Sequence, residues 1–200
     1  MAEGNATGGA LTAALDEALA AARALPRPGW RNRVKDEQPR GPAETFLAFV
    51  RKQVTARSDA GSPYSLETDI LPPIDGLLPA AKQLEGALTQ LEGPLRSLMT
   101  GFTRLLDSEA SELDSNTRAR IEAIIRTVER RGLLPVTAWR SMLSALREST
   151  PPEFVDWFAV ERTDGYDLDV GLHRHWVDPT LPFARALADH THGLAITSAT

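Results

Sequence analysis

The chain has 200 residues, of which 42% are hydrophobic and 24% charged, and its formal net charge at pH 7 is −5. This composition is typical of a globular chain with one domain or two small ones, and no apolar run approaches the roughly eighteen residues that a membrane-spanning helix needs. Residues 1–9 lack the basic start and apolar run of a secretory signal, and the absence of cysteine excludes disulfides and cysteine-ligated metal. We therefore expect a cytoplasmic protein with no membrane among its partners.

The first part of the chain is predicted to be helical. Ala and Leu recur through residues 10–25, with acidic residues early and an arginine late, and a Pro-Arg-Pro-Gly run ends this helix. A charged connector is expected over residues 30–38. A second helix then starts near Pro42, because proline is favoured at a first helical position, and it runs to about Arg57 before a loop over 58–65.

The strongest periodic signal is a run of apolar residues spaced alternately four and three apart. A repeat of about 3.5 residues places such residues on one side of a long helix, facing a partner helix. Pro94 lies inside the run, so we expect the helix to bend there. The run comprises Leu77, Ala81, Leu84, Leu88, Leu91, Leu95, Leu98, Phe102 and Leu105.

The next helix is expected to be the antiparallel partner of the long one. Asp114 or Ser115 caps its start, and Gly132 with Pro135 predicts a kink further along. Because short connections favour antiparallel neighbours, residues 1–149 are predicted to form an antiparallel helical bundle without strands. The apolar stripe of this partner helix consists of Ile121, Ile124, Ile125 and Val128.

The pattern changes after residue 150, where β-branched and aromatic residues become frequent. Residues 154–162 are predicted to form a strand, Asp164 and Gly165 a hairpin turn, and the residues up to Trp176 a returning strand with one polar face. Trp157 and Trp176 are expected to pack in the core rather than to stack on bases.

A short helix is predicted after Asp178 and Pro179, and an apolar strand follows at residues 194–196. The predicted fold class is therefore mainly α with a small α/β tail. The bundle occupies residues 1–149, and a β-hairpin, a short helix and a terminal strand occupy residues 150–200.

Two His-x-His pairs could in principle bind a metal ion. His173 and His175 share one face of the predicted strand with Asp169, whereas His190 and His192 follow the short helix. A zinc site would need a third and a fourth ligand folded back onto the strand. We therefore predict roles for these histidines on the polar face or at the helix end, and no metal site.

The last quarter of the chain carries the most specific motif. It reads Pro-Pro-Glu-Phe-Val-Asp-Trp-Phe, then the hairpin, then His-Arg-His-Trp-Val-Asp-Pro at 173–179, a helix, and Ile-Thr-Ser-Ala-Thr at 196–200. This order resembles the DinG/XPD-like ATP-dependent DNA helicases. In that family a mostly helical insertion, the Arch, lies between the DEAH box and motif III, and motif III reads Thr-Ser-Ala-Thr.

The resemblance implies that residues 1–149 are an Arch-like insertion and that residues 150–200 return into the first motor domain. It also implies that motif III couples the nucleotide state to strand movement, since short hydroxyl side chains at a strand end can exchange hydrogen bonds when the γ-phosphate departs. The residues that correspond to motif III are Thr197, Ser198, Ala199 and Thr200.

The chain contains neither a G-x-x-x-x-G-K-[ST] phosphate loop nor an Asp-Glu-Ala-His run, so we expect it to have no ATPase activity by itself. The resemblance therefore implies a segment of a longer helicase whose remaining motor domains bind ATP and Mg²⁺. The apolar strand at 194–196 favours the same interpretation, because a buried parallel strand needs neighbours on both edges. In the family the iron–sulfur cysteines, where present, precede the DEAH box, so this chain does not indicate whether the longer protein has a cluster.

Arginine is in excess on the helix that starts near residue 115 and on its continuation. In an Arch that closes over single-stranded DNA, such residues would contact the phosphate backbone. Two alternatives remain open: a solvated face on which Glu and Arg pair, and a stand-alone helical protein-interaction module without enzymatic activity. The candidate nucleic-acid-binding residues are Arg118, Arg126, Arg130 and Arg131.

Overall fold

The computed structural model describes residues 2–59, 61–108, 113–188, 191–193 and 195. It shows a mainly helical chain, with 62% helix, and a small three-stranded antiparallel sheet. The predicted mainly helical class is confirmed, and the sheet has one strand more than the predicted hairpin.

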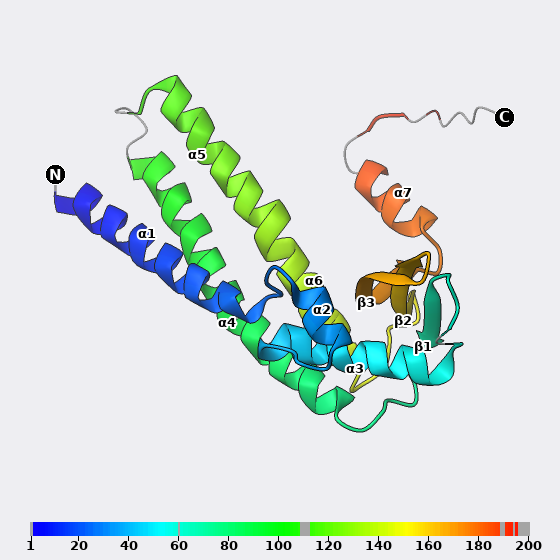
Figure 1. Ribbon diagram of the computed structural model, residues 1–200. Helices are drawn as coiled ribbons and strands as arrows, with labels where there is room; N and C mark the ends of the chain where they lie inside the picture. Colours follow the sequence, from blue (N-terminus) through cyan, green and yellow to red (C-terminus); the bar gives the residue numbers. More distant parts are fainter. Residues whose placement is uncertain (1, 60, 109–112, 189–190, 194, 196–200) are drawn as a thin grey trace.

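Three helices extend together as an arm in Figure 1, and the central one, α4, packs against both of the others. They are α1 (Ala2–Ala21), α4 (Leu77–Ser108) and α5 (Ser115–Val128). All three were predicted, although α1 begins earlier than expected and ends in a 3₁₀ turn, η1, at Ala22–Ala24. α4 continues as one helix through Pro94.

The arm is held together by the apolar seam of α4. Leu88, Leu91 and Leu98 of this seam are buried. Gly101 lets α1 approach α4 closely, because a Cβ added there would lie 2.6 Å from Leu11 Cδ2. The seam residues predicted from the 3.5-residue repeat therefore face the core of the arm.

The start of α5 is capped as predicted. Asp114 Oδ1 accepts hydrogen bonds from the backbone N–H groups of Asn116 and Thr117 at 2.9 and 3.0 Å. Bonds of this kind satisfy donors that have no partner within the helix.

The predicted kink after α5 is a change of helical pitch. A π-helical segment, η2 (Glu129–Leu133), leads directly into α6 (Leu134–Ala145). Pro135 has no N–H with which to continue the α-helical hydrogen-bond pattern, which agrees with a wider turn at this point. α6 packs against α4 at the base of the arm.

The charged connector predicted over residues 30–38 is partly wrong, because Trp30–Lys35 form a short helix, α2. Gly29 precedes it in the left-handed conformation, with φ 79°. Val34 is buried, and α2 packs against the predicted second helix, α3 (Gly41–Arg57).

The prediction that residues 1–149 contain no strand is wrong, because Leu66–Asp69 form β1. This strand pairs antiparallel with β2 (Phe154–Thr163), with Leu66 opposite Val160. One sheet therefore includes residues from both sides of the expected boundary at 149, while the division into two domains stays a prediction.

The predicted hairpin is confirmed. β2 is followed by β3 (Tyr166–Trp176), and the turn residues Asp164 and Gly165 have φ values of 52° and 80°, as a type I′ turn requires. The register shifts between Glu161 and Arg162, which marks a β-bulge.

The bulge changes the face on which Asp167 lies, since strict alternation along β3 would place this residue on the polar face with Asp169. Asp167 accepts hydrogen bonds from the Nε atoms of Arg51 and Arg162, each at 2.8 Å. Burial raises the pKa of this carboxyl, but the two arginines outweigh that effect and hold the pKa below its usual value. The hairpin is thereby linked to α3.

The core joins the sheet to the helices. Phe158 of β2 is fully buried and meets the ring of Phe46 of α3 edge to face, with centroids 6.4 Å apart. The same apolar cluster includes Val50, Val160 and the buried seam of α4. In Figure 1, α3 accordingly lies beneath the sheet.

The predicted short helix is confirmed as α7 (Thr180–Ala188), and Asp178 Oδ1 accepts a hydrogen bond from the Thr180 backbone N–H at 2.9 Å. The terminal strand predicted at 194–196 falls, apart from residue 195, outside the described residues. Among the described helices, none combines the length and the apolarity that a bilayer crossing requires.

Candidate nucleic-acid interface

The predicted DNA contacts lie on α5 and η2, which together carry five arginines and two glutamates. Arg118, Arg126 and Arg130 are separated by multiples of four residues, and each step of four turns about 40° around an α-helix, so the three wind about 120° around the axis. Arg131 follows Arg130 directly and therefore points to a different side. The four candidates form a band around the solvent side of the arm rather than a single line.

Two of the four candidates share one carboxylate. Arg118 Nε lies 3.6 Å from Glu122 Oε1, and Arg126 Nη1 lies 4.0 Å from Glu122 Oε2. Exposed pairs four residues apart in a helix contribute only about 0.3–0.5 kcal/mol each. A phosphate could therefore replace Glu122 at modest cost.

The other two candidate arginines have no competing carboxylate partner in the described part of the chain. Arg130 and Arg131 are exposed and have no ion pair with any described residue. They lie in η2, and π-helical segments are frequent at functional sites. A Cβ added at Gly132 would lie 3.5 Å from Leu95 Cδ1, so this glycine faces α4 at the end of the band.

Two further arginines, on the continuation of α5 toward α6 and beyond, form structural ion pairs. Arg140 is hydrogen-bonded to Glu92, and Arg147 Nη2 lies 2.6 Å from Glu85 Oε2, so both hold the α6 end of the helix against α4. Hydrogen bonds from Arg96, supported by Arg140, hold the pKa of Glu92 below its usual value despite its burial. These arginines are not free to bind a ligand.

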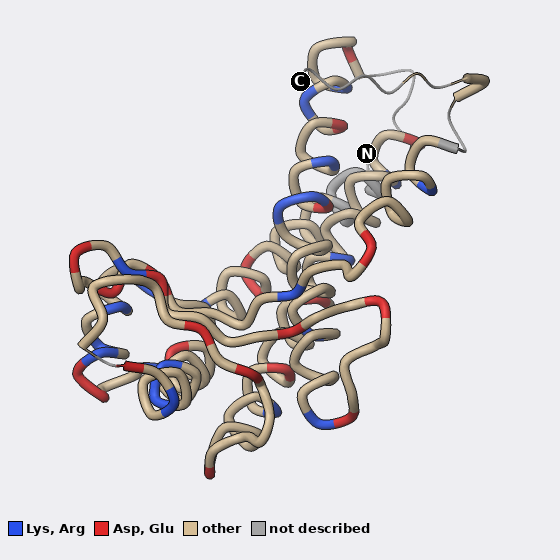
Figure 2. Tube along the Cα trace, turned by 90° about the vertical axis from the view of Figure 1, so that its right-hand side faces the viewer, with Lys and Arg blue, Asp and Glu red and all other residues tan. Residues whose placement is uncertain are grey.

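The candidate residues of the arm offer positive charge but little for base stacking. Figure 2 shows Lys and Arg distributed along the arm among acidic residues rather than in one continuous basic face. α5 and η2 contain no aromatic residue, and Trp139 of α6, with 48% of its surface exposed, is the next aromatic along the chain. Binding here would depend on charge and not on base identity.

The four motif III residues predicted from the resemblance, Thr197, Ser198, Ala199 and Thr200, lie outside the described residues.

The expectation that Trp157 packs in the core is wrong. Its ring lies on the outer face of the sheet, stacked on His173 with centroids 5.3 Å apart and in edge contact with His175 at 4.7 Å. Trp176 lies on the opposite face against Phe154, with centroids 4.4 Å apart. Within the described part of the chain, no three His, Asp or Glu side chains converge as metal ligands.

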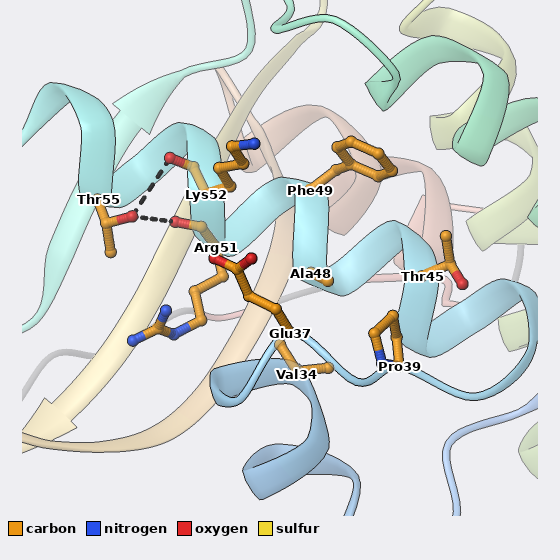
Figure 3. A pocket seen from close by; sticks show the side chains of 9 residues that line it. All are labelled: Val34, Glu37, Pro39, Thr45, Ala48, Phe49, Arg51, Lys52 and Thr55. Atoms are coloured by element: carbon orange, nitrogen blue, oxygen red, sulfur yellow. Dashed lines mark hydrogen bonds between the residues drawn. The ribbon is translucent and has the colours of Figure 1, made fainter.

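A hollow of about 230 Å³ lies over α3, and Figure 3 shows its lining residues. The Thr55 hydroxyl donates to the backbone carbonyls of Arg51 and Lys52 at 2.9 and 3.3 Å. The Arg51 guanidinium is held by Asp167, whereas the charged groups of Glu37 and Lys52 have no ion pair among the described residues. We assign it no function.

Sequence reasoning missed the acidic residues that β1 brings to the outer face of the sheet. Glu67 lies opposite Ala159, and Asp69 lies opposite Trp157. The tetrapeptide Leu-Glu-Thr-Asp has little strand propensity, so only its apolar Leu66 and the turn residues before it could have suggested a strand.

Comparison with protein-family models, with curated proteins and with solved structures finds no match for this chain.

Proposed function

We propose that this chain is the Arch-like arm of a DinG/XPD-like ATP-dependent DNA helicase and that it contacts the backbone of single-stranded DNA. The observation that carries the proposal is the pair Arg130 and Arg131, exposed and without ion pairs among the described residues, on a projecting helical arm. The order of elements supports it, because a hairpin and a short helix follow the arm as the resemblance requires.

In this proposal the arm supplies a grip that does not depend on base sequence. Arg130 and Arg131 bind phosphates directly, and Arg118 and Arg126 exchange their shared Glu122 for phosphates. The motor domains of the longer protein bind ATP and Mg²⁺ and supply the free energy for movement. Motif III at 197–200 relays the nucleotide state to those domains.

The proposal is tested by titrating the chain into a fluorescently labelled oligo-dT and repeating the titration at several salt concentrations. Each arginine–phosphate contact on a single strand contributes about −0.7 to the slope of log Kobs against log[salt]. We expect the double variant Arg130→Ala/Arg131→Ala to bind more weakly and to have a slope shallower by about 1.4.

The matched control is Lys52→Ala/Arg185→Ala, which also removes two exposed positive charges, from α3 and α7, away from the arm. It should leave the affinity and the slope unchanged, and Arg130→Lys/Arg131→Lys should retain the slope. An unchanged slope in the double alanine variant, or an equal loss in the control, would reject this interface.

Helicase membership has a separate test in the gene. The reading frame that contains this chain should encode a phosphate-binding loop and a DEAH box before it and a Gln-x-x-Gly-Arg motif after it. The full protein should then hydrolyse ATP in response to single-stranded DNA, and a frame without these motifs would refute the assignment.

A helical protein-interaction module remains a second candidate, because α6 exposes two large apolar side chains. Leu134 and Trp139 are 56% and 48% exposed. Such a module would leave the oligonucleotide unbound at low salt, so the same titration separates the two candidates.

A further inference from the structure

The outer face of the sheet, on the side away from α3, combines aromatic and acidic side chains. Residues directly opposite each other on antiparallel strands point to the same face, so the register fixes which side chains are neighbours. Trp157 lies between Asp69 and His173, and the next row along the strands contains Glu67, Ala159 and Gly171.

This face contains a hollow of about 400 Å³ whose lining residues come from the three strands and the segments that adjoin them. Its floor is Ala159, which is 4% exposed. Trp157 forms one wall, with the imidazole of His173 stacked on the indole at an interplanar angle of 19°. The hollow is therefore a shallow site with a preformed aromatic surface.

The opposite wall is acidic. Glu67 and Glu161 both line the hollow and are exposed, and neither carboxylate has an ion pair or hydrogen bond with a described residue. Glu67 is opposite Ala159, and Glu161 follows Ala159 by two residues on the same face, so the two carboxylates are diagonal neighbours. Arg162 also lines the hollow, but its guanidinium is paired with Asp167. The two carboxylates without ion pairs would therefore repel a phosphate backbone and attract a cation.

We propose that this hollow binds the side chain of a lysine or arginine from a basic segment of a protein partner. The aliphatic stem of that residue packs over Ala159, its cationic group lies against the Trp157 indole, and Glu67 and Glu161 neutralise its charge. Charge complementarity selects this partner, because the face offers two free carboxylates beside the strongest cation–π acceptor among the side chains.

The indole nitrogen supports an extended peptide as the ligand. Trp157 Nε1 is buried and has no hydrogen-bond partner among the described residues. A backbone carbonyl of the bound segment would supply the missing acceptor once an imidazole beside it rotates. This inference does not depend on the helicase assignment.

The test uses the ¹⁵N-labelled chain and three short capped peptides, Gly-Arg-Gly, Gly-Lys-Gly and the neutral Gly-citrulline-Gly. The chain has four tryptophans, and a Trp157→Phe variant assigns the Trp157 indole signal. We expect the Arg and Lys peptides to shift that signal saturably at millimolar concentrations, and the citrulline peptide to leave it in place.

A double variant isolates the acidic wall. Glu67→Gln/Glu161→Gln alters two exposed side chains, so the fold should be retained, and we expect the dissociation constant of the Arg peptide to rise about five- to tenfold. The control Glu148→Gln/Glu153→Gln makes the same change in net charge at other exposed positions and should leave binding unchanged.

Three results would overturn the inference. The first is no shift of the Trp157 signal with either cationic peptide. The second is an equal shift with the citrulline peptide, which would show an apolar hollow without selectivity for charge. The third is an equal loss of binding in both double variants, which would show attraction by net charge alone.

Discussion

At the scale of single residues, the buried carboxylate of Glu44 is the clearest electrostatic feature. It is 1% exposed and accepts hydrogen bonds from Arg33 Nε at 2.8 Å and from the backbone N–H of Arg40 at 2.9 Å. The hydrogen bonds from Arg33, with smaller contributions from the backbone groups, lower the pKa of Glu44 to about 2 in spite of its burial. This group fastens the segment before α3 to the helix itself.

A lowered folded-state pKa gives a defined dependence of stability on pH. The contribution of Glu44 is fully present above its ordinary pKa of 4.5 and is lost as the pH falls from there toward about 2. We expect Glu44→Gln to lower the free energy of unfolding at pH 7 by about 3 kcal/mol and to remove much of the acid sensitivity in that range. Urea denaturation at pH 7, 4 and 3 measures both effects.

The comparison for this prediction is Glu153→Gln, which alters an exposed carboxylate without buried partners. It should change the unfolding free energy by less than about 0.5 kcal/mol. An unchanged pH profile in Glu44→Gln would show that Arg33 does not hold this carboxylate ionised.

At the scale of elements, α4 depends on the glycine that precedes it. Gly76 has φ 88°, and a Cβ added there would lie 2.6 Å from two atoms of the Phe49 ring. Gly86 lies inside α4 with open space around it. The same substitution should therefore have opposite effects at the two positions.

We expect Gly76→Ala to destabilise the protein by about 1–3 kcal/mol, because it combines an unfavourable backbone conformation with a steric clash. Gly86→Ala should stabilise it by about 0.5–1 kcal/mol, since alanine is the better helix former. The midpoints of thermal unfolding of the two variants, compared with that of the unchanged chain, measure these effects. A stabilising Gly76→Ala would contradict the geometry at the start of α4.

The sequence predicts elements well where their own residues determine them. The 3.5-residue seam located α4, and the Asp164-Gly165 turn located the hairpin. α2 and β1 were missed because Trp30–Lys35 and Leu66–Asp69 are short and polar, and both form through contacts with distant parts of the chain.

The same distinction, between local patterns and contacts with distant parts of the chain, applies to the candidate sites. The exposure of Arg130 could be predicted, because it lies about half a turn away from the apolar stripe of α5. Arg131 lies two turns after Ile124, a stripe residue that is itself 43% exposed, so its exposure could not. The outer face of the sheet could not, because Glu67 belongs to the missed strand β1. Trp157 was misassigned since an aromatic residue in a strand is usually buried, whereas here histidines cover it.

At the scale of the whole molecule, one apolar cluster spans the arm and the sheet. Ala14 and Leu98 of the arm belong to the same cluster as Phe158 and Val170 of the sheet. A shared core predicts that helices and sheet unfold together.

Phe158→Ala tests this coupling. Truncation of a fully buried phenylalanine costs about 3–5 kcal/mol. The variant is made in a Trp30→Phe/Trp139→Phe background, in which the remaining tryptophans, Trp157 and Trp176, belong to the sheet. We expect far-UV circular dichroism, which reports the helices, and tryptophan fluorescence, which then reports the sheet, to shift to the same lower midpoint. Helices that melted at the original temperature while the sheet melted earlier would show two independent units.

The pairing of β1 with β2 has a consequence for synthesis on the ribosome. Val160 is made roughly 90 residues after Leu66, so a nascent chain carries β1 without its partner while those residues are synthesised. The arm helices can form earlier, because all of their residues precede β2 in the chain. Closure of the sheet is thus the step that must wait for the hairpin to emerge, and until then the unpaired backbone of β1 is open to other strands or to chaperones.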